Sequence, residues 1–375
     1  MARILDLTSE VSVYAARLLA ECGHDVIRVE CRKGDAVRRT PPFLRDEIDL
    51  EHGAFHRFFN TGKRSFTADV GHEAGRDLFF DLLATSDAVL AGSRCSIPVD
   101  NLVNANPKAV VAIVEGEAEG DVIGAAGSGL LALVGEPDGE PLVLGGHAMN
   151  CAVGLYAGLA VSAALQLRKI SGTGQKVRIS AEQALLAMCE QAAIACSTEG
   201  RIPGRRGFRG EITAASSAFA AADGYWMLSV TAAGKAWKDF VDWVQDPVLL
   251  ADTSLEDEAQ RRAKQHLIAE RLDAWSLLHN KNELIAEAQR RRIPSSPVST
   301  VLDVAGDEQL IARGFLAPEV DGEFGSAKVP QGALATASGR SLRPAPRLGQ
   351  HNAEILAELG YTRNEHAALL AAGAL

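Results

Sequence analysis

The N-terminal residues alternate between strand and helix patterns, and this alternation restricts the fold more than any other feature. Arg3–Leu7 has the pattern of a buried strand, Val11–Cys22 has apolar side chains at helical spacing, and Asp25–Val29 has the pattern of a second strand. A strand, a helix and a strand within about 30 residues form a βαβ unit, whose two strands are parallel. We therefore expect an α/β fold built on a parallel sheet.

The turn after the first of these strands lacks the glycines of a dinucleotide-binding fold. Residues 6–10 read Asp-Leu-Thr-Ser-Glu. Glycines are required at this turn because the backbone must approach a pyrophosphate closely. The sequence therefore excludes a nicotinamide- or flavin-dependent dehydrogenase.

The alternation continues to residue 196 and then changes. Further strands and helices are expected, in order, at Ser65–Val70, Glu73–Ala84, Ala88–Ala91, Ala109–Val114, Ala152–Lys169, Lys176–Ile179 and Ala181–Cys196. Residues 197–214, rich in glycine and arginine, are predicted to be a linker. Residues 215–317 have the pattern of a smaller α+β domain, and 318–375 are predicted to form a second linker and a C-terminal tail.

Composition narrows the classes of partner. The net charge of −10 opposes nucleic-acid binding, which normally needs a basic face. The longest apolar run, Cys151–Leu167, is shorter than the roughly 20 residues of a membrane-spanning helix. The six cysteines have neither a Cys-x-x-Cys pair nor metal-ligand spacing. We therefore expect a cytoplasmic protein with no metal, no nucleic-acid partner and no membrane partner.

Several segments, in order and spacing, resemble one enzyme family. They are ILDLTSEVSVYAARLLAECGHDVIRVE, GDAVR at Gly34–Arg38, FFNTGKRSFTADV at Phe58–Val70, GEPDGEP at Gly135–Pro141 and LGQHNAEILAELGY near the C-terminus. From end to end the chain resembles the family III CoA-transferases, the superfamily of formyl-CoA transferase, carnitine CoA-transferase and 2-methylacyl-CoA racemase.

This resemblance implies a particular architecture. Residues 1–196 and the tail would form a Rossmann-like large domain, with the smaller α+β domain inserted between them. The resemblance also implies an interlocked dimer, in which each chain threads through the other and both contribute to each active site.

The family's nucleophile is missing at the position that the resemblance assigns to it. In the family an aspartate attacks the acyl-CoA thioester, and the mixed anhydride that forms becomes an aspartyl-CoA thioester. Asn150 stands at this position. An amide nitrogen is not nucleophilic because its lone pair is delocalised into the carbonyl, so Asn150 cannot form the anhydride. Its plain structural interpretation is the N-terminal cap of the helix that follows.

Part of the family's CoA-binding set is retained. The resemblance assigns CoA contacts to Arg38, Lys63, Arg64 and Arg94, and arginine forks suit phosphate oxygens. The family's Asn-Phe-Arg-Pro-Gly motif is reduced here to Gly-Ser-Arg-Cys-Ser at 92–96, and Asp100 replaces a basic residue. We expect no tightly bound cofactor, with CoA or acyl-CoA as the ligand.

Two other residues near Asn150 are candidates to replace the missing aspartate. His147 is three residues upstream and could polarise a thioester carbonyl or move a proton, although it does not match the family's racemase histidine. The segment that matches the racemase Gly-His-Asp run is 119–121, Glu-Gly-Asp, so a racemase is disfavoured. Cys151 is interpreted as a core cysteine, because one helical step turns its side chain by about 100° from that of Asn150.

These observations lead to one principal hypothesis and two alternatives. The principal one is a non-catalytic subunit of a heteromeric CoA-transferase, whose paralogous partner supplies the aspartate. Benzylsuccinate CoA-transferase, a two-subunit family member, is a precedent. The first alternative is an active acyl-CoA transferase, isomerase or dehydratase of altered mechanism that uses His147 and Asn150. The second is a homodimer with a CoA-binding regulatory role or a structural role.

Overall fold

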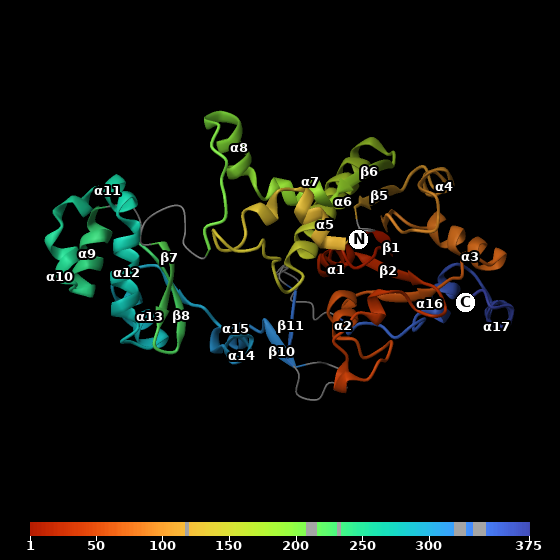
Figure 1. Cartoon of the computed structure of the whole chain (residues 1–375). Helices are drawn as coiled ribbons and strands as arrows, with labels where there is room; N and C mark the ends of the chain where they lie inside the picture. Colours follow the sequence, from red (N-terminus) through yellow and green to blue (C-terminus); the bar gives the residue numbers. More distant parts are fainter. Residues whose placement is uncertain (117–119, 208–215, 231–233, 319–327, 333–342) are drawn as a thin grey trace. The chain divides into compact units, whose positions relative to one another are not determined.

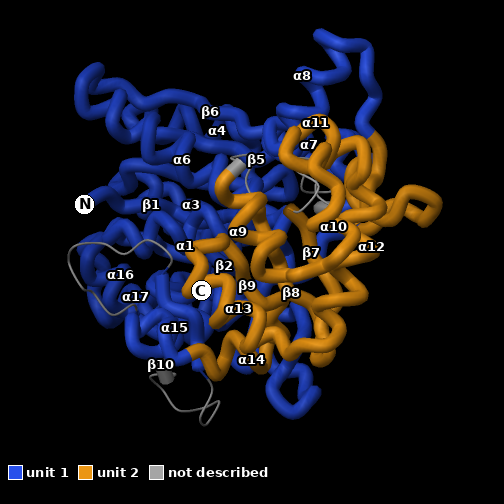
Figure 2. The backbone as a smooth tube through the Cα atoms, turned by 90° about the vertical axis from the view of Figure 1, so that its left-hand side faces the viewer, with its two compact units in different colours: residues 1–132, 143–203, 308–375 blue, residues 133–142, 204–307 orange. Residues whose placement is uncertain are grey.

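The computed structural model describes residues 1–116, 120–207, 216–230, 234–318, 328–332 and 343–375 (Figure 1). The chain forms two compact units (Figure 2): unit 1 comprises residues 1–132, 143–203 and 308–375, and unit 2 comprises 133–142 and 204–307. Residues 133–142 pack with unit 2 although they precede the predicted linker. The reason is local, because the Arg205 guanidinium donates to the carbonyls of Glu136 at 3.2 Å and Gly139 at 2.8 Å.

Unit 1 contains a six-stranded parallel sheet with the order β3-β2-β1-β4-β5-β6. Its strands are β1 (Arg3–Leu7), β2 (Asp25–Glu30), β3 (Arg64–Thr67), β4 (Ala88–Gly92), β5 (Val110–Glu115) and β6 (Gln175–Ser180). The predicted α/β class with a parallel sheet is confirmed. Because the strand order reverses between β1 and β4, the two strands diverge into separate loops at their carboxyl ends.

Helices pack on both faces of this sheet. The helices of unit 1 are α1 (Val13–Glu21), α2 (Ala54–Asn60), α3 (Glu73–Ala84), α4 (Val99–Ala105), α5 (Gly120–Gly127), α6 (Ala148–Ser171), α7 (Ala181–Ala187), α8 (Glu190–Glu199), α15 (Glu308–Ala312), α16 (Asn352–Glu358) and α17 (Arg363–Ala372). Leu5 and Ile27 face the core cluster of α3, α4 and α16, which includes Phe79 and Ile355. The alternate strand residues point to the opposite face, which α1 and α6 cover.

Short 3₁₀ turns and a hairpin complete unit 1. The turns span η1 (Val37–Arg39), η2 (Leu44–Asp46) and η4 (Leu130–Ala132), and the antiparallel pair is β10 (Leu316–Pro318) with β11 (Lys328–Pro330). The C-terminal segment is held on the sheet, since α16 packs beside β3 and α17 beside α3.

One predicted helix is divided in the structure. The segment 181–196 forms α7 and α8 with a break at Met188 and Cys189. The break contains no proline or glycine, so the sequence carried no signal for it. The structure also begins α6 at Ala148, four residues before the predicted start.

Helix α6 is the one helix in the described ranges that is long and apolar enough to cross a membrane. Of its most apolar window, 56% is buried inside the protein. It packs along α1 and against β5 and β6, as the core helix of a globular domain does.

Unit 2 has its own antiparallel sheet and its own core. The sheet has the order β7-β8-β9, from Ser216–Ala221, Gly224–Ser229 and Ser295–Pro297. Its helices are α9 (Gly234–Val244), α10 (Pro247–Ala251), α11 (Glu258–Ala263), α12 (Gln265–Ser276), α13 (Lys281–Arg290) and α14 (Val301–Ala305), with a 3₁₀ turn, η5 (Thr253–Glu256). The core gathers Trp226, Trp237 and Phe240. Unit 2 is therefore an α+β unit, and Trp237 lies in its core.

Candidate functional site

A crevice opens at the carboxyl ends of the parallel strands in unit 1. It has a volume of about 370 Å³ and is lined by the loop after β1, at Thr8 and Ser9, and by the loop after β4, at Arg94 and Ser96. These two loops flank the point where the strand order reverses, which is where open α/β sheets bind their ligands. The crevice is therefore the principal candidate site of this unit.

The cation at the base of this crevice is neutralised by the protein itself. Arg28 of β2 is buried, and its guanidinium donates to Asp6 at 2.9 Å and to Asp35 through Nε at 2.9 Å. Burial opposes ionisation of Asp6, but the positive charges of Arg28 and Lys63 prevail and lower the pKa of its carboxyl to about 2. At the base of the crevice, the positive charge of Arg28 is thus balanced by the carboxylates of Asp6 and Asp35.

Lys63, one of the residues predicted to bind CoA, lies fully buried behind these charges. Its ammonium donates to Asp6 at 2.7 Å, to the side-chain oxygen of Asn60 at 2.8 Å and to the carbonyl of Val13 at 3.3 Å. Burial lowers the pKa of Lys63 to about 8 although Asp6 opposes the shift. All three hydrogen-bond positions of the ammonium are therefore used within the fold.

Arg38 is likewise committed to internal partners. Its guanidinium makes a two-pronged pair with Glu30, at 2.7 and 2.9 Å, and a further pair with Glu51 at 2.8 Å. It also donates to the carbonyl of Pro346 at 3.1 Å, which attaches the C-terminal segment to β2. The side chain has no exposed surface. In this structure Arg38 organises the region behind the crevice and does not line it.

Arg64 connects the sheet edge to the C-terminal helix α16. Its guanidinium contacts Asp25 at 2.6 Å and Glu358 at 2.7 Å. Of the four predicted CoA-binding residues, Arg94 alone lines the crevice, where it is exposed. The resemblance assigns CoA contacts to four cationic side chains. In the structure three of them are buried in ion pairs, and only Arg94 lies on the wall of the crevice.

Asn150 is not the N-terminal cap of α6. The cap is His147, whose backbone is left-handed with φ 57°, and Asn150 is the third residue of the helix. The expectation of a capping role is wrong because the helix begins earlier than its apolar pattern does. Asn150 is 5% exposed, and within the described part of the chain its Oδ1 has no hydrogen-bond partner. A buried, unsatisfied polar atom is costly and calls for a specific explanation.

The packing of two glycines shows where Asn150 lies. A Cβ on Gly154 would meet Tyr14 at 2.8 Å, and one on Gly158 would lie 3.7–3.8 Å from Ala15 and Leu18, so α6 runs along α1 in the same direction. Asn150 is one turn before Gly154 on the same face. This spacing places Asn150 beside the start of α1. The crevice residues Thr8 and Ser9 shortly precede α1 in the sequence.

The neighbours of Asn150 differ in their chemistry. The exposed ring of His147 lies edge-on to Phe55, with ring centroids 4.8 Å apart. Cys151 is half-buried, and burial raises the pKa of its thiol, which disfavours the reactive thiolate. Cys151 is thus a packing residue, as expected. The racemase-like segment 119–121 has no described side chains, and 208–214 of the predicted linker lie outside the described residues.

Two buried acids, Asp6 and Glu30, are not among the residues predicted for the site. A signal for them is present in the sequence, since Asp6 interrupts the apolar strand ILDL and Glu30 ends the strand VIRVE. A charge at a buried strand position requires a partner, so such interruptions predict internal ion pairs. What the sequence could not supply was the identity of each partner.

Comparison with known proteins agrees with this architecture. The family model of CoA-transferase family III matches residues 2–352. The succinyl-CoA:mesaconate CoA-transferase of Haloarcula hispanica is 27% identical, over 96% of this chain and 95% of its own. The succinyl-CoA:(R)-benzylsuccinate CoA-transferase subunit BbsE of Thauera aromatica is 29% identical, over 100% of this chain and 97% of its own. The crystal structure of a CAIB/BAIF family protein from Brucella suis superposes with a TM-score of 0.82, at 26% identity, over 96% of this chain and 98% of that one.

Proposed function

Because the chain belongs to CoA-transferase family III, we propose that it is the non-catalytic subunit of a heteromeric CoA-transferase. The complex would transfer CoA between an acyl-CoA and a carboxylate, and the aspartate nucleophile would come from a paralogous subunit. The observation that carries this proposal is Asn150. Its carboxamide is buried where the resemblance places the nucleophile, and it cannot form an anhydride.

The residues around Asn150 supply no substitute for the missing aspartate. The described residues offer Oδ1 of Asn150 no hydrogen-bond partner. Cys151, next to it, has a raised thiol pKa and does not supply a substitute nucleophile.

A relative with a partner supports the heteromeric form. BbsE, 29% identical over the whole of this chain, is named as a subunit of a CoA-transferase. Unit 1 also exposes apolar side chains along α6, with Leu155 and Leu159 one turn apart, and Ile170 near the end of the helix. Exposed apolar surface of this kind is typical of protein–protein interfaces. Such a surface agrees with an obligate complex, whether the partner is a paralogue or a second copy.

The crevice is the proposed CoA-binding site. Its volume of about 370 Å³ falls within the range of small-molecule sites, roughly 300–1,000 Å³. Arg94 on its wall supplies a guanidinium suited to phosphate oxygens. Arg38, Lys63 and Arg64 would support CoA binding through the fold, since each is paired with carboxylates. CoA would act here as a substrate.

The test compares the purified chain with a co-expressed complex. The chain is produced alone and together with a family III paralogue that carries the aspartate, each preparation is weighed by native mass spectrometry, and transfer from succinyl-CoA to mesaconate is followed by chromatography of the CoA esters. We expect a mixed complex with activity that the single chain lacks. Asn150→Ala in the complex should leave turnover unchanged, whereas aspartate→alanine in the paralogue should abolish it. Transfer catalysed by the single chain would refute the proposal.

A second candidate function rests on the position of His147. At the cap of α6 it is three residues before Asn150 in the sequence. Together they could polarise a thioester carbonyl in an enzyme of altered mechanism. This alternative predicts acyl-CoA turnover by the single chain and its loss in His147→Ala. The same two preparations, the single chain and the co-expressed complex, therefore distinguish the two proposed functions.

A further inference from the structure

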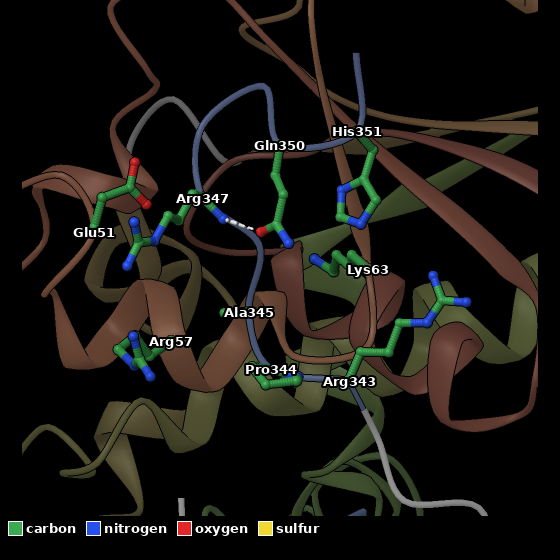
Figure 3. A pocket seen from close by; sticks show the side chains of 9 residues that line it. All are labelled: Glu51, Arg57, Lys63, Arg343, Pro344, Ala345, Arg347, Gln350 and His351. Atoms are coloured by element: carbon green, nitrogen blue, oxygen red, sulfur yellow. Dashed lines mark hydrogen bonds between the residues drawn. The ribbon is translucent and has the colours of Figure 1, made fainter. Parts of the chain in front are cut away.

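Residues 346–349, which we call the strap, belong to the C-terminal segment that returns to unit 1. The strap borders a second pocket of about 320 Å³, formed where residues 343–351 pass α2 (Figure 3). This pocket shares no lining residue with the crevice. Pro346 is buried, and Leu348 and Gly349 are half-buried. Although the strap does not line the crevice, its contacts lead through the protein to residues that do.

The first connection between the strap and the crevice runs through the buried side chain of Arg38. Its guanidinium donates to the carbonyl of Pro346 at 3.1 Å and makes the two-pronged pair with Glu30, at 2.7 and 2.9 Å. The Arg38 N–H also donates to the Asp35 carboxylate at 3.3 Å. Glu30 and Asp35 both line the crevice. One residue thus joins the strap to the end of β2 and to the loop that follows it.

A second connection reaches the same carboxylate through Ser65 of β3. The Gly349 N–H of the strap donates to the hydroxyl oxygen of Ser65 at 2.9 Å, and this hydroxyl donates to Glu30 at 3.2 Å. Ser65 has no exposed surface. A hydroxyl donates one hydrogen bond and can accept others, so both contacts can exist at once. The Glu30 carboxylate is therefore held from the strap along two separate paths.

Glu51, from the loop before α2, fastens the strap to Arg38. One oxygen of Glu51 accepts from Arg38 at 2.8 Å, and the other accepts from the Leu348 N–H at 3.0 Å. If the strap moved away, Arg38 would lose an acceptor, and Glu51 and Ser65 would each lose a donor. Buried polar groups that lose their partners destabilise a structure. The position of the strap and the position of Glu30 therefore depend on each other.

The charge of Glu30 gives this dependence a direction. A carboxylate in the lining of the crevice repels the phosphates of CoA unless a cation neutralises it. Arg38 is the cation paired with Glu30, and the Pro346 carbonyl and Glu51 fix its guanidinium in place. The arrangement with the strap in place is therefore the one that accommodates an anionic ligand.

We propose that the strap positions the wall of the crevice, so that ligand binding and the attachment of the strap stabilise each other. Glu51 and Ser65 are its positioning residues, since neither lines the crevice and both act on it through other side chains. The inference rests on the proposed role of the crevice as the CoA site. Coupling between two sites is reciprocal, so CoA must protect the strap, and a loosened strap must weaken CoA binding.

Hydrogen exchange of the full-length chain, measured by mass spectrometry with and without saturating CoA, tests the protection of the strap. The amides of Leu348 and Gly349 donate to Glu51 and to Ser65, so their exchange reports these contacts. We expect CoA to slow their exchange about fivefold, the lower end of typical coupling between sites. Helix α3, in the core of the same unit, reports overall stabilisation and should be slowed less. Equal slowing of α3 and the strap, or an unchanged strap, would overturn the proposal.

Calorimetric titration of variants with CoA tests the reciprocal effect. Glu51→Ala removes the acceptor of the Leu348 N–H and should weaken CoA binding about fivefold, while exchange of the strap becomes faster. Ser65→Ala breaks the second path and should act in the same direction. Glu47→Ala is the matched control, because Glu47 is an exposed acid of the same loop, and it should bind CoA as the wild type does.

Urea denaturation of each variant separates positioning from a purely structural role. If Glu51→Ala and Ser65→Ala lose stability but bind CoA as tightly as Glu47→Ala, the contacts are structural only and the proposal is overturned. Ser65→Ala removes a single oxygen atom and keeps the test available if Glu51→Ala does not fold. A wild type that does not bind CoA would also overturn the proposal. That result would leave the subunit role standing, because turnover by the single chain and by the complex decides that role.

Discussion

The two pockets of unit 1 use positive charge in opposite ways. In the crevice, Arg28 is buried and paired with Asp6 and Asp35, so the cation belongs to the fold. In the second pocket, of about 320 Å³, where residues 343–351 pass α2 (Figure 3), Arg343 and Arg347 are exposed and the single lining carboxylate, Glu51, pairs with buried Arg38. A cation that is buried with an acid builds the fold around a site, whereas an exposed cation remains in contact with solvent. Charge alone does not reveal which role a residue has.

The largest expected effect follows from breaking a buried pair. Lys63→Met leaves Asp6 with one cation fewer in a fully buried setting. We expect the free energy of unfolding to fall by about 3–5 kcal/mol, as it does when one partner of a buried ion pair is removed. Urea denaturation of the purified chain measures it.

The control for this prediction is the same substitution at a surface pair. Lys176 contacts Asp100 at 3.2 Å, with both side chains exposed. Lys176→Met should cost less than about 1 kcal/mol. Equal losses in the free energy of unfolding at the two positions would show that the buried ion pair does not stabilise the fold. The contrast between the two pockets would then be wrong.

A smaller effect is expected from pH, through His56 behind the crevice. Burial and the adjacent Arg38 lower its pKa from 6.5 to about 2 in the folded chain. Nε2 lies 3.1 Å from Nη1 of Arg38, which can only donate, so the ring is neutral. The unfolded chain takes up a proton below pH 6.5 that the folded chain does not. Stability should therefore fall by about 1.4 kcal/mol per pH unit on acidification.

The variant His56→Gln should flatten this dependence between pH 6.5 and the range near pH 4 where carboxyl groups begin to titrate. His72→Gln removes an exposed histidine of the same unit and should leave the slope as it is. Denaturant titrations at a series of pH values measure both. An unchanged slope in His56→Gln would mean that His56 is protonated inside the fold.

The smallest effect concerns CoA binding in the crevice. Arg94→Ala should weaken CoA binding by about fivefold, since one exposed charged hydrogen bond contributes on the order of 1 kcal/mol. The double variant Arg343→Ala/Arg347→Ala changes residues that line the other pocket and should leave CoA binding unchanged. Calorimetric titration with CoA measures both. A double variant that loses CoA binding more than Arg94→Ala does would merge the two sites into one.

Much of the secondary structure could be predicted because it depends on residues that are close in the sequence. The helix Glu73–Ala84 and the strand Arg3–Leu7 have the predicted bounds, since their hydrophobic periods end at clear turns. The break at Cys189 could not be predicted, because no glycine or proline marks it. The start of α6 directly follows Gly145, Gly146 and His147, but the predicted start followed the long apolar run from Cys151. The same early start moved Asn150 from the cap to the third position of its helix. An error of a few residues at a helix end thus changed the interpretation of the central residue of the site.

The sequence by itself determined the order of strands and helices, the resemblance to one family and the absence of a carboxylate at Asn150. These depend on residue identity and on neighbours within a few positions. The tertiary structure alone decided which cations are neutralised. Lys63 meets Asp6 across 57 residues of chain, and Arg64 meets Glu358 across 294. The strength of a charge depends on its burial and on its nearest partner, and both are set only when distant segments pack together.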